Sequence, residues 1–149
     1  MDNRPRRPSV LEKNMISLLE HVEEIVLAVK NQEKAVALFE SLFGLEFDRT
    51  WTVPADSMQV KCAMVGDTQF HIVASTEPDT IIDKFVGERG EGLHHVAFRV
   101  KDLDAVVSHL RGLGIKVIPE TPRTGREGAR YAFVHPRSVF GLLIELIER

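Results

Sequence analysis

The stretch EIVLAVKN at residues 24–31 decides the fold, because it recurs as HVAFRVKD at residues 95–102. Each copy has the apolar run of a buried strand, followed by Lys and a small polar residue that can begin a helix. The match extends to the closing strands, where FHI at residues 70–72 corresponds to IEL at residues 144–146. The chain therefore contains two copies of one unit.

The first unit, about residues 22–75, is predicted to be a strand, a helix and three strands. Asn31 can cap the helix, its apolar residues recur with helical spacing, and Gly44 can end it. We expect the helix at residues 32–43 and strands near residues 24–30, 45–53, 58–65 and 68–74.

The second unit, about residues 93–148, repeats this order after a connector at residues 75–92 that can hold a short helix. We expect a helix from Asp102 to about Leu113 and strands near residues 93–100, 115–118, 130–135 and 141–147. A polar, Gly-rich, basic loop is predicted at residues 119–130. The result is an α+β fold, with one domain at residues 21–149 and a loose N-terminal arm at residues 1–20.

Composition narrows the function classes. Of 149 residues, 44% are hydrophobic and 28% charged, and the net charge is -3, which argues against a general nucleic-acid binder. No apolar run is long enough to span a membrane, and the first fifteen residues lack the apolar core of a signal peptide. The single cysteine, Cys62, excludes an internal disulfide. We expect a cytoplasmic protein without nucleic-acid or membrane partners.

The repeat brings four metal-binding residue types into equivalent places. Glu24 corresponds to His95, and His71 corresponds to Glu145. His71 and Glu145 each stand between apolar neighbours, where an unsatisfied polar group is costly. Two imidazoles and two carboxylates suit one divalent ion such as Co, Ni, Zn, Mn or Fe(II). The sequence therefore predicts a metal site at the pseudo-twofold axis.

Each of these residues has an ordinary explanation when taken singly. His71 alone is typical of a satisfied core histidine, Glu145 of a sheet edge and Glu24 of an exposed charge. His94 and His95 are expected on opposite faces of one strand, and the repeat selects His95. The metal hypothesis depends on four positions matching under one symmetry.

Three further segments carry a family resemblance: GEGLHHVAFRV at residues 90–100, FVHPRS at 133–138 and GLLIEL at 141–146. They resemble the vicinal oxygen chelate superfamily, and within it the methylmalonyl-CoA epimerases, over about residues 22–148. The resemblance implies paired βαβββ modules that form an open, cup-shaped mixed sheet with metal at its floor. It also implies a homodimer, because dimers predominate in the family.

The resemblance implies metal ligands at His95 and Glu145. The family's first-strand histidine falls on Glu24, and its remaining Gln or Glu ligand falls on His71, so imidazole and carboxylate exchange places in the first unit. The family's PEQGV block reads PADSM at residues 54–58, and its Gly-Gly before the last strand reads Phe140-Gly141. These departures leave the substrate open.

The function that the resemblance implies is a metal-dependent isomerase acting on an acyl-CoA. Its ion would stabilise an enolate formed next to a thioester carbonyl, and Glu145 or Glu24 would move the proton. Arg123, Arg126 and Arg130 can meet a carboxylate or phosphate of such a substrate, although solvated loop charge is the ordinary explanation for each.

Three other functions remain open from the residues. One is a glyoxalase-type lyase acting on a hemithioacetal or similar thiol adduct. Another is an Fe(II) dioxygenase, since His71, His95 and Glu145 make a two-histidine, one-carboxylate set. The last is a metal-free small-molecule binding protein, which the retention of all four coordinating residue types argues against.

Overall fold

The computed structural model describes residues 17–149, in which a single eight-stranded sheet joins both modules. The strands lie in the order β2-β3-β4-β1-β5-β8-β7-β6. Their bounds are β1 His21–Ala28, β2 Arg49–Val53, β3 Met58–Val65, β4 Thr68–Ser75, β5 Gly92–Arg99, β6 Val117–Thr124, β7 Arg130–Val134 and β8 Ile144–Glu148. This arrangement confirms the predicted α+β fold with an open mixed sheet.

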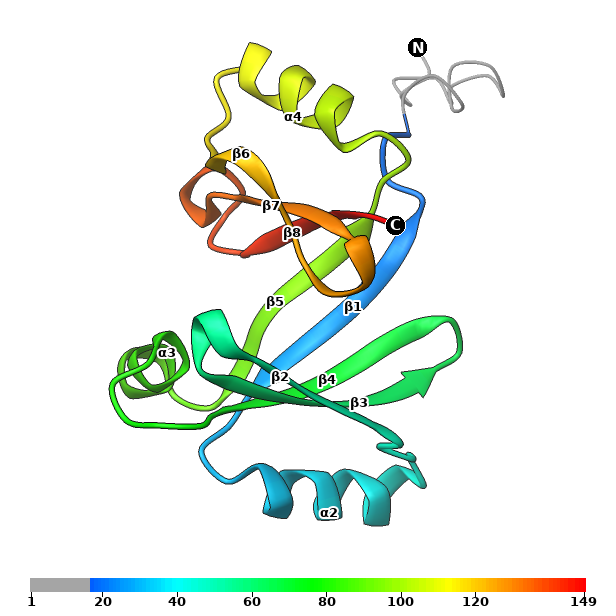
Figure 1. Cartoon of the computed structure of the whole chain (residues 1–149), viewed down its shortest axis with the longest axis vertical. Helices are drawn as coiled ribbons and strands as arrows, with labels where there is room; N and C mark the ends of the chain where they lie inside the picture. The colour runs from blue at the N-terminus through cyan, green and yellow to red at the C-terminus, as the bar shows by residue number, and fades with distance from the viewer. Residues whose placement is uncertain (1–16) are drawn as a thin grey trace, which may run out of the picture.

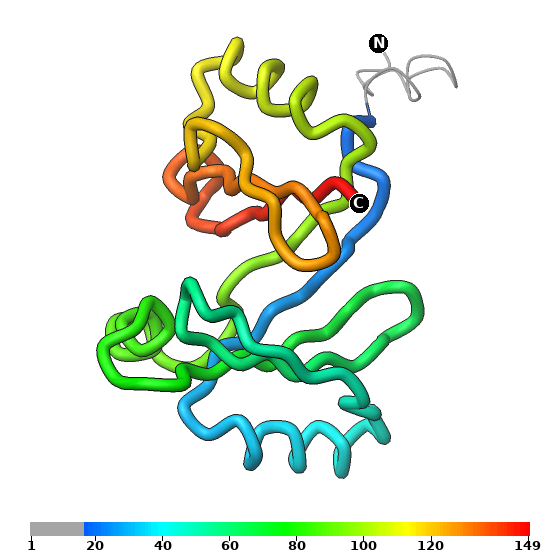
Figure 2. Tube along the Cα trace, in the orientation of Figure 1, coloured from blue at the N-terminus to red at the C-terminus, as the bar shows by residue number. Residues whose placement is uncertain are grey.

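The two modules are joined through their first strands. β1 and β5 pair antiparallel, and each also pairs in parallel with the last strand of its own module, β4 or β8. Figure 2 shows β1 and β5 running side by side through the middle of the molecule. First and last strands of both modules are therefore neighbours at the centre of the sheet.

The module helices are α2 (Gln32–Phe43) and α4 (Leu103–Gly112). They begin alike, because the Asn31 side chain accepts a hydrogen bond from Lys34 N at 3.0 Å and Asp102 accepts one from Ala105 N at 3.1 Å. Gly44 ends α2 with a φ of 66°, a left-handed conformation that glycine adopts without strain. The same cap interaction in both modules confirms that the sequence repeat corresponds to a repeated structural unit.

Two helices, α2 and α4, cover the outer face of the sheet, whereas the connector helix packs on part of the inner face. Figure 1 shows α2 and α4 at opposite ends of the molecule, with the two half-sheets between them. Val106 and Leu146 belong to the core beneath α4, and Val36 and Ile72 to the core beneath α2. Apolar residues of the connector helix α3 (Ile81–Arg89) pack with Val26 and Val73. Val26 and Val73 lie on the inner face, so α3 covers part of it, and the rest of that face holds the site.

The predicted loop at residues 119–130 is partly wrong, because β6 continues to Thr124 before a short 3-10 turn, η2 (Arg126–Gly128). β6 pairs with β7 at both ends, with an irregular register between Ile118 and Arg123. Pro119 and Pro122 donate no backbone hydrogen bond, but β6 is an edge strand, where proline is tolerated.

Other boundaries differ by a few residues. β1 begins at His21 rather than residue 24, residues 45–48 are not strand, and β8 begins at Ile144 rather than residue 141. Of the arm predicted at residues 1–20, positions 1–16 lie outside the described residues, and 17–20 have no regular structure. The single-domain boundary at residue 21 stays a prediction.

Candidate metal centre

Strand register puts the two predicted carboxylate ligands in one row across the sheet. Glu24 on β1 lies opposite Ala97 on β5, and Ala97 lies opposite Glu145 on β8. Residues directly opposite each other on paired strands project from the same face. Both carboxylates therefore reach the inner face on either side of a small alanine.

The two predicted histidine ligands share the neighbouring row. Val26 on β1 lies opposite His71 on β4 and opposite His95 on β5. Val26 is two residues beyond Glu24, so both rows face the same way. The sheet thus presents all four predicted ligands on one face.

Three of these side chains converge. Glu24, His95 and Glu145 each offer a donor atom, and these atoms all lie within 4.8 Å of one another. The shortest separation is 2.9 Å, between His95 Nε2 and Glu145 Oε2. Atoms bound to one ion at about 2.0–2.2 Å lie at most about 4.4 Å apart, so small side-chain movements bring this set onto one ion.

The electrostatics of Glu24 favour a cation. Burial, followed by the charge of the nearby Glu145 carboxylate, raises the pKa of Glu24 to about 8. Arg149 opposes this shift, because its Nη2 donates to Glu24 Oε1 at 3.1 Å and its Nε donates to Glu23 Oε1 at 2.8 Å. The residues present fit a divalent ion, whose positive charge would offset the burial and mutual repulsion of two carboxylates.

His71 lies at the edge of this group rather than within the convergent three. Its Nδ1 is 4.0 Å from Glu24 Oε2, and its Nε2 lies 2.9 Å from the side-chain oxygen of Gln69. An amide oxygen only accepts, so Nε2 carries the proton and Nδ1 keeps a lone pair toward Glu24. Burial, followed by the charge of His95, lowers the pKa of His71 to about 3. Its role as a fourth ligand stays a prediction.

A β-bulge changes the expected relation between His94 and His95. Val26 lies opposite His95 and Leu27 opposite Leu93, which leaves His94 as an extra residue. The two rings are therefore not separated by the sheet: their Nδ1 atoms are 2.8 Å apart. Simple alternation missed this contact because a bulge interrupts the two-residue period.

An aromatic and cationic wall borders the histidines. The Trp51 ring meets the His71 ring edge-on, with centroids 5.2 Å apart, and Arg126 Cζ lies 4.1 Å above the Trp51 ring. Trp51 belongs to the first module and Arg126 to η2 of the second, so this contact bridges the modules. Trp51 is the only tryptophan in the chain, which makes its fluorescence a specific reporter of the site.

The three predicted substrate-binding arginines occupy different environments. Arg126 contacts Trp51 as described, whereas Arg130 donates to both carboxylate oxygens of Asp104, at 3.0 and 2.8 Å. These hydrogen bonds lower the pKa of Asp104 and raise that of Arg130. Arg123 is exposed on β6. Substrate binding by all three stays a prediction.

Sequence reasoning missed several residues around the site. Gln69 was detectable, because it precedes His71 by two positions and so shares its face. Arg49 Nη2 lies 3.1 Å from Met64 Sδ and 3.5 Å from Cys62 Sγ, and Cys62 lies opposite His71. Arg149 follows β8 and gives no pattern that distinguishes it from a surface charge.

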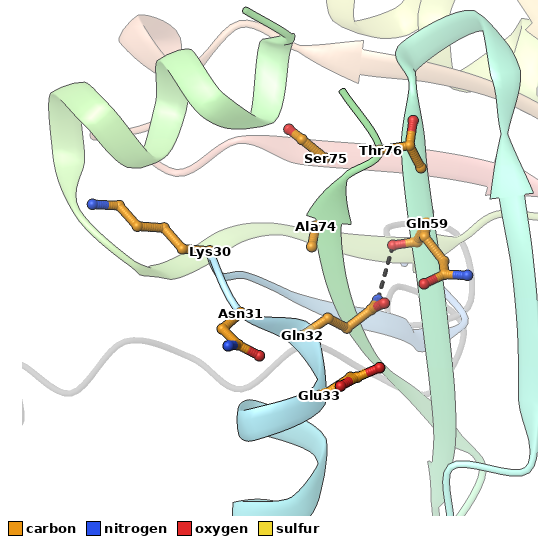
Figure 3. A pocket seen from close by; sticks show the side chains of 8 residues that line it. All are labelled: Lys30, Asn31, Gln32, Glu33, Gln59, Ala74, Ser75 and Thr76. Carbon is orange, nitrogen blue, oxygen red and sulfur yellow. Dashed lines mark hydrogen bonds between the residues drawn. The ribbon is translucent and has the colours of Figure 1, made fainter. Parts of the chain in front are cut away.

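A separate pocket of about 410 Å³ opens beside the start of α2 (Figure 3). Gln32 lies against it, and its side-chain amide donates to Gln59 O at 3.0 Å and Ile72 O at 2.8 Å. None of the four predicted ligands lines this pocket.

No helix among residues 17–149 has both the length and the hydropathy to cross a bilayer.

Several proteins are similar to this chain in sequence or in structure. An uncharacterized Bacillus subtilis protein, YqjC, is 29% identical over 130 residues, covering 87% of this chain and 91% of the relative. The Mycobacterium tuberculosis methylmalonyl-CoA epimerase structure superposes with a TM-score of 0.82 at 29% identity, covering 89% of this chain and 90% of that one.

A Streptomyces coelicolor methylmalonyl-CoA epimerase in complex with 2-nitronate-propionyl-CoA superposes with a TM-score of 0.80 at 26% identity, covering 87% and 97% of the two chains. The family model for the Glyoxalase/Bleomycin resistance protein/Dioxygenase superfamily matches residues 23–133. This match covers most of both modules. With the duplicated fold and the similar epimerases, it shows that the chain belongs to this superfamily.

Proposed function

We propose that this protein is a metal-dependent isomerase that moves a proton next to the thioester carbonyl of an acyl-CoA. The observation that carries the proposal is the convergence of Glu24, His95 and Glu145 donor atoms within 4.8 Å on the inner face. A buried set of one imidazole and two carboxylates suits a borderline divalent cation. The similarity to methylmalonyl-CoA epimerases supports the isomerase class.

Glu24, His95 and Glu145 would hold the ion, with His71 as the fourth ligand. A divalent cation at this place supplies positive charge that stabilises the negative charge developing on a carbonyl oxygen. The walls around it include Trp51 and Phe133, whose ring centroid lies 5.7 Å from that of His95. Such apolar walls exclude water and strengthen electrostatic stabilisation.

Two carboxyl groups on the inner face suit a proton shuttle. Glu145 would remove the substrate proton and Glu24 would return one, as general base and general acid. In the metal-free chain the pKa of Glu24 is about 8. Glu24 would therefore hold the proton that an acid must return only when it has detached from the ion, because a bound divalent cation favours the ionised carboxylate. The two groups come from different modules and lie on either side of Ala97 on the inner face.

Substrate recognition would use the arginines of β6, η2 and β7. Arg126 is the best placed, because it packs on the ring of Trp51, which in turn contacts the ring of His71. Arg123 and Arg130 would meet the carboxylate or phosphates of the substrate farther out. We further propose a homodimer, as the family resemblance implies.

A glyoxalase-type lyase is the second candidate. The same pair of carboxyl groups beside an ion would move the proton of a hemithioacetal, and the chain belongs to the Glyoxalase/Bleomycin resistance protein/Dioxygenase superfamily. The dioxygenase candidate has less support, because the convergent set holds one histidine and two carboxylates.

The test is metal analysis of the purified protein, followed by solvent deuterium incorporation into methylmalonyl-CoA and into a hemithioacetal. We expect one divalent ion per chain and exchange at the α carbon of the acyl-CoA. Glu145→Gln should lose exchange and Glu40→Gln, an exposed control on α2, should keep it. A protein that binds no ion, or exchanges neither substrate, would refute the proposal, and selective turnover of the hemithioacetal would identify the lyase.

A further inference from the structure

The bulge at His94 has a counterpart in the first module. Val22 lies opposite Phe98 and Glu24 opposite Ala97, which leaves Glu23 as the extra residue of β1. Each module therefore carries one extra residue directly before its first-strand ligand. β-Bulges redirect side chains and are treated as built features of a fold.

Each extra residue contacts either the predicted ligand that follows it or the hydrogen-bond donor of that ligand. Glu23 shares Arg149 with Glu24, since Arg149 donates to an oxygen of each carboxylate. His94 contacts His95 directly, through the two Nδ1 atoms at 2.8 Å. In both modules the bulge residue thus helps to hold the predicted ligand that follows it. In the first module it acts through the shared Arg149, and in the second through a direct contact between two rings.

The contacts of His95 use both of its ring nitrogens. Nε2 lies 2.9 Å from Glu145 Oε2, inside the convergent set, while Nδ1 points to His94. A nitrogen that binds an ion must offer a lone pair, so a neutral ring that binds through Nε2 carries its proton on Nδ1. His94 Nδ1 is then the acceptor for that proton.

The His94 ring is itself held in place. It packs against Phe85 of α3 with centroids 4.6 Å apart and an interplanar angle of 63°. Helix α3 thereby fixes the position from which His94 meets His95.

We propose that His94 is a positioning residue, whose Nδ1 accepts the Nδ1 proton of His95 and so directs the Nε2 lone pair of His95 at the metal site. The proposal rests on the metal centre of the proposed function. Outer hydrogen-bond partners of this kind orient the imidazole, and their loss typically weakens metal binding about 10- to 100-fold.

Three variants separate positioning from packing. His94→Phe keeps an aromatic ring against Phe85 but removes the accepting nitrogen. His94→Asn offers an amide oxygen from a side chain of similar reach and should restore acceptance. His109→Phe makes the same exchange at an exposed position of α4 and serves as the matched control.

The first measurement is calorimetric titration of each purified, chelator-treated protein with Zn²⁺. We expect His94→Phe to bind about 10- to 100-fold more weakly, with His94→Asn and His109→Phe close to the parent. Thermal unfolding of the metal-free proteins measures any packing defect separately. Equal Zn²⁺ affinity in His94→Phe and the parent would overturn the proposal.

The second measurement does not require metal. In the metal-free, ¹⁵N-histidine-labelled protein, we expect a nitrogen–nitrogen coupling across the hydrogen bond between the Nδ1 atoms of His94 and His95, absent in His94→Phe. Its absence in the parent would refute the contact. If the coupling is present but no protein binds Zn²⁺, the metal-dependent function fails while the hydrogen bond stands.

Discussion

Replacing Glu24 with Gln should remove much of the pH dependence of stability from the metal-free protein. The pKa of Glu24 is about 8 in the folded chain, against an ordinary value of 4.5. Between these values the folded state holds one proton more than the unfolded state, so stability falls as pH rises. The stabilising contribution is fully present below about pH 4.5 and is lost as pH rises through 8.

The size of the effect follows from the same two values. Linkage gives about 1.4 kcal/mol per pH unit in this window, so from pH 5 to pH 8 the parent should lose about 3 to 4 kcal/mol relative to Glu24→Gln. His71 and His94, with pKa values lowered to about 3 and about 4, change stability in the opposite direction below pH 6.5. Both are present in the two proteins, so their contribution cancels in the difference.

The assay is urea unfolding of chelator-treated protein at pH 5, 6, 7 and 8, followed by Trp51 fluorescence. Glu40→Gln removes a carboxylate from an exposed position of α2 and should behave like the parent. Stability curves of the parent and Glu24→Gln that run parallel from pH 5 to pH 8 would refute a raised pKa at Glu24. A saturating divalent ion should abolish the fall in the parent, because it stabilises the ionised carboxylate.

Three other changes test separate parts of the structure. Glu145→Gln should lower α-proton exchange about 10²- to 10⁴-fold, the range expected for removal of a general base, and deuterium incorporation measures it. Arg149→Met leaves the buried carboxylates of Glu23 and Glu24 without their shared donor and should cost about 1–3 kcal/mol at pH 8, measured by urea unfolding; an unchanged midpoint would show that the contact contributes nothing. Leu103→Ala, at the fully buried first position of α4, should cost about 2–5 kcal/mol in the same assay, whereas Leu38→Ala on the exposed face of α2 should change stability by less than about 1 kcal/mol.

Local patterns predicted most of the secondary structure. The caps at Asn31 and Asp102 and the stop at Gly44 are confirmed, because capping depends on residues within one helical turn. β6 was mistaken for loop where prolines interrupt it, since its place at the edge of the sheet was not evident from the chain itself.

The site was predictable in part, because symmetry is visible in the sequence. Matching positions in the two copies identified Glu24, His95 and Glu145, which converge. Symmetry could not place His71 relative to them, since its separation from the other donors depends on how far the sheet curls. Nor did it reveal Arg149 or the Nδ1 contact of His94, which arise from partners distant in sequence or from a bulge.

The sequence by itself determined the duplicated α+β unit and the residue types that face the pseudo-twofold axis, because strand alternation and helix caps are local properties. Only the tertiary structure decided which donor atoms meet, which carboxyl group has a raised pKa and which residues contact each predicted ligand. These depend on sheet curvature, burial and the two bulges, which are set by packing between segments far apart in the chain.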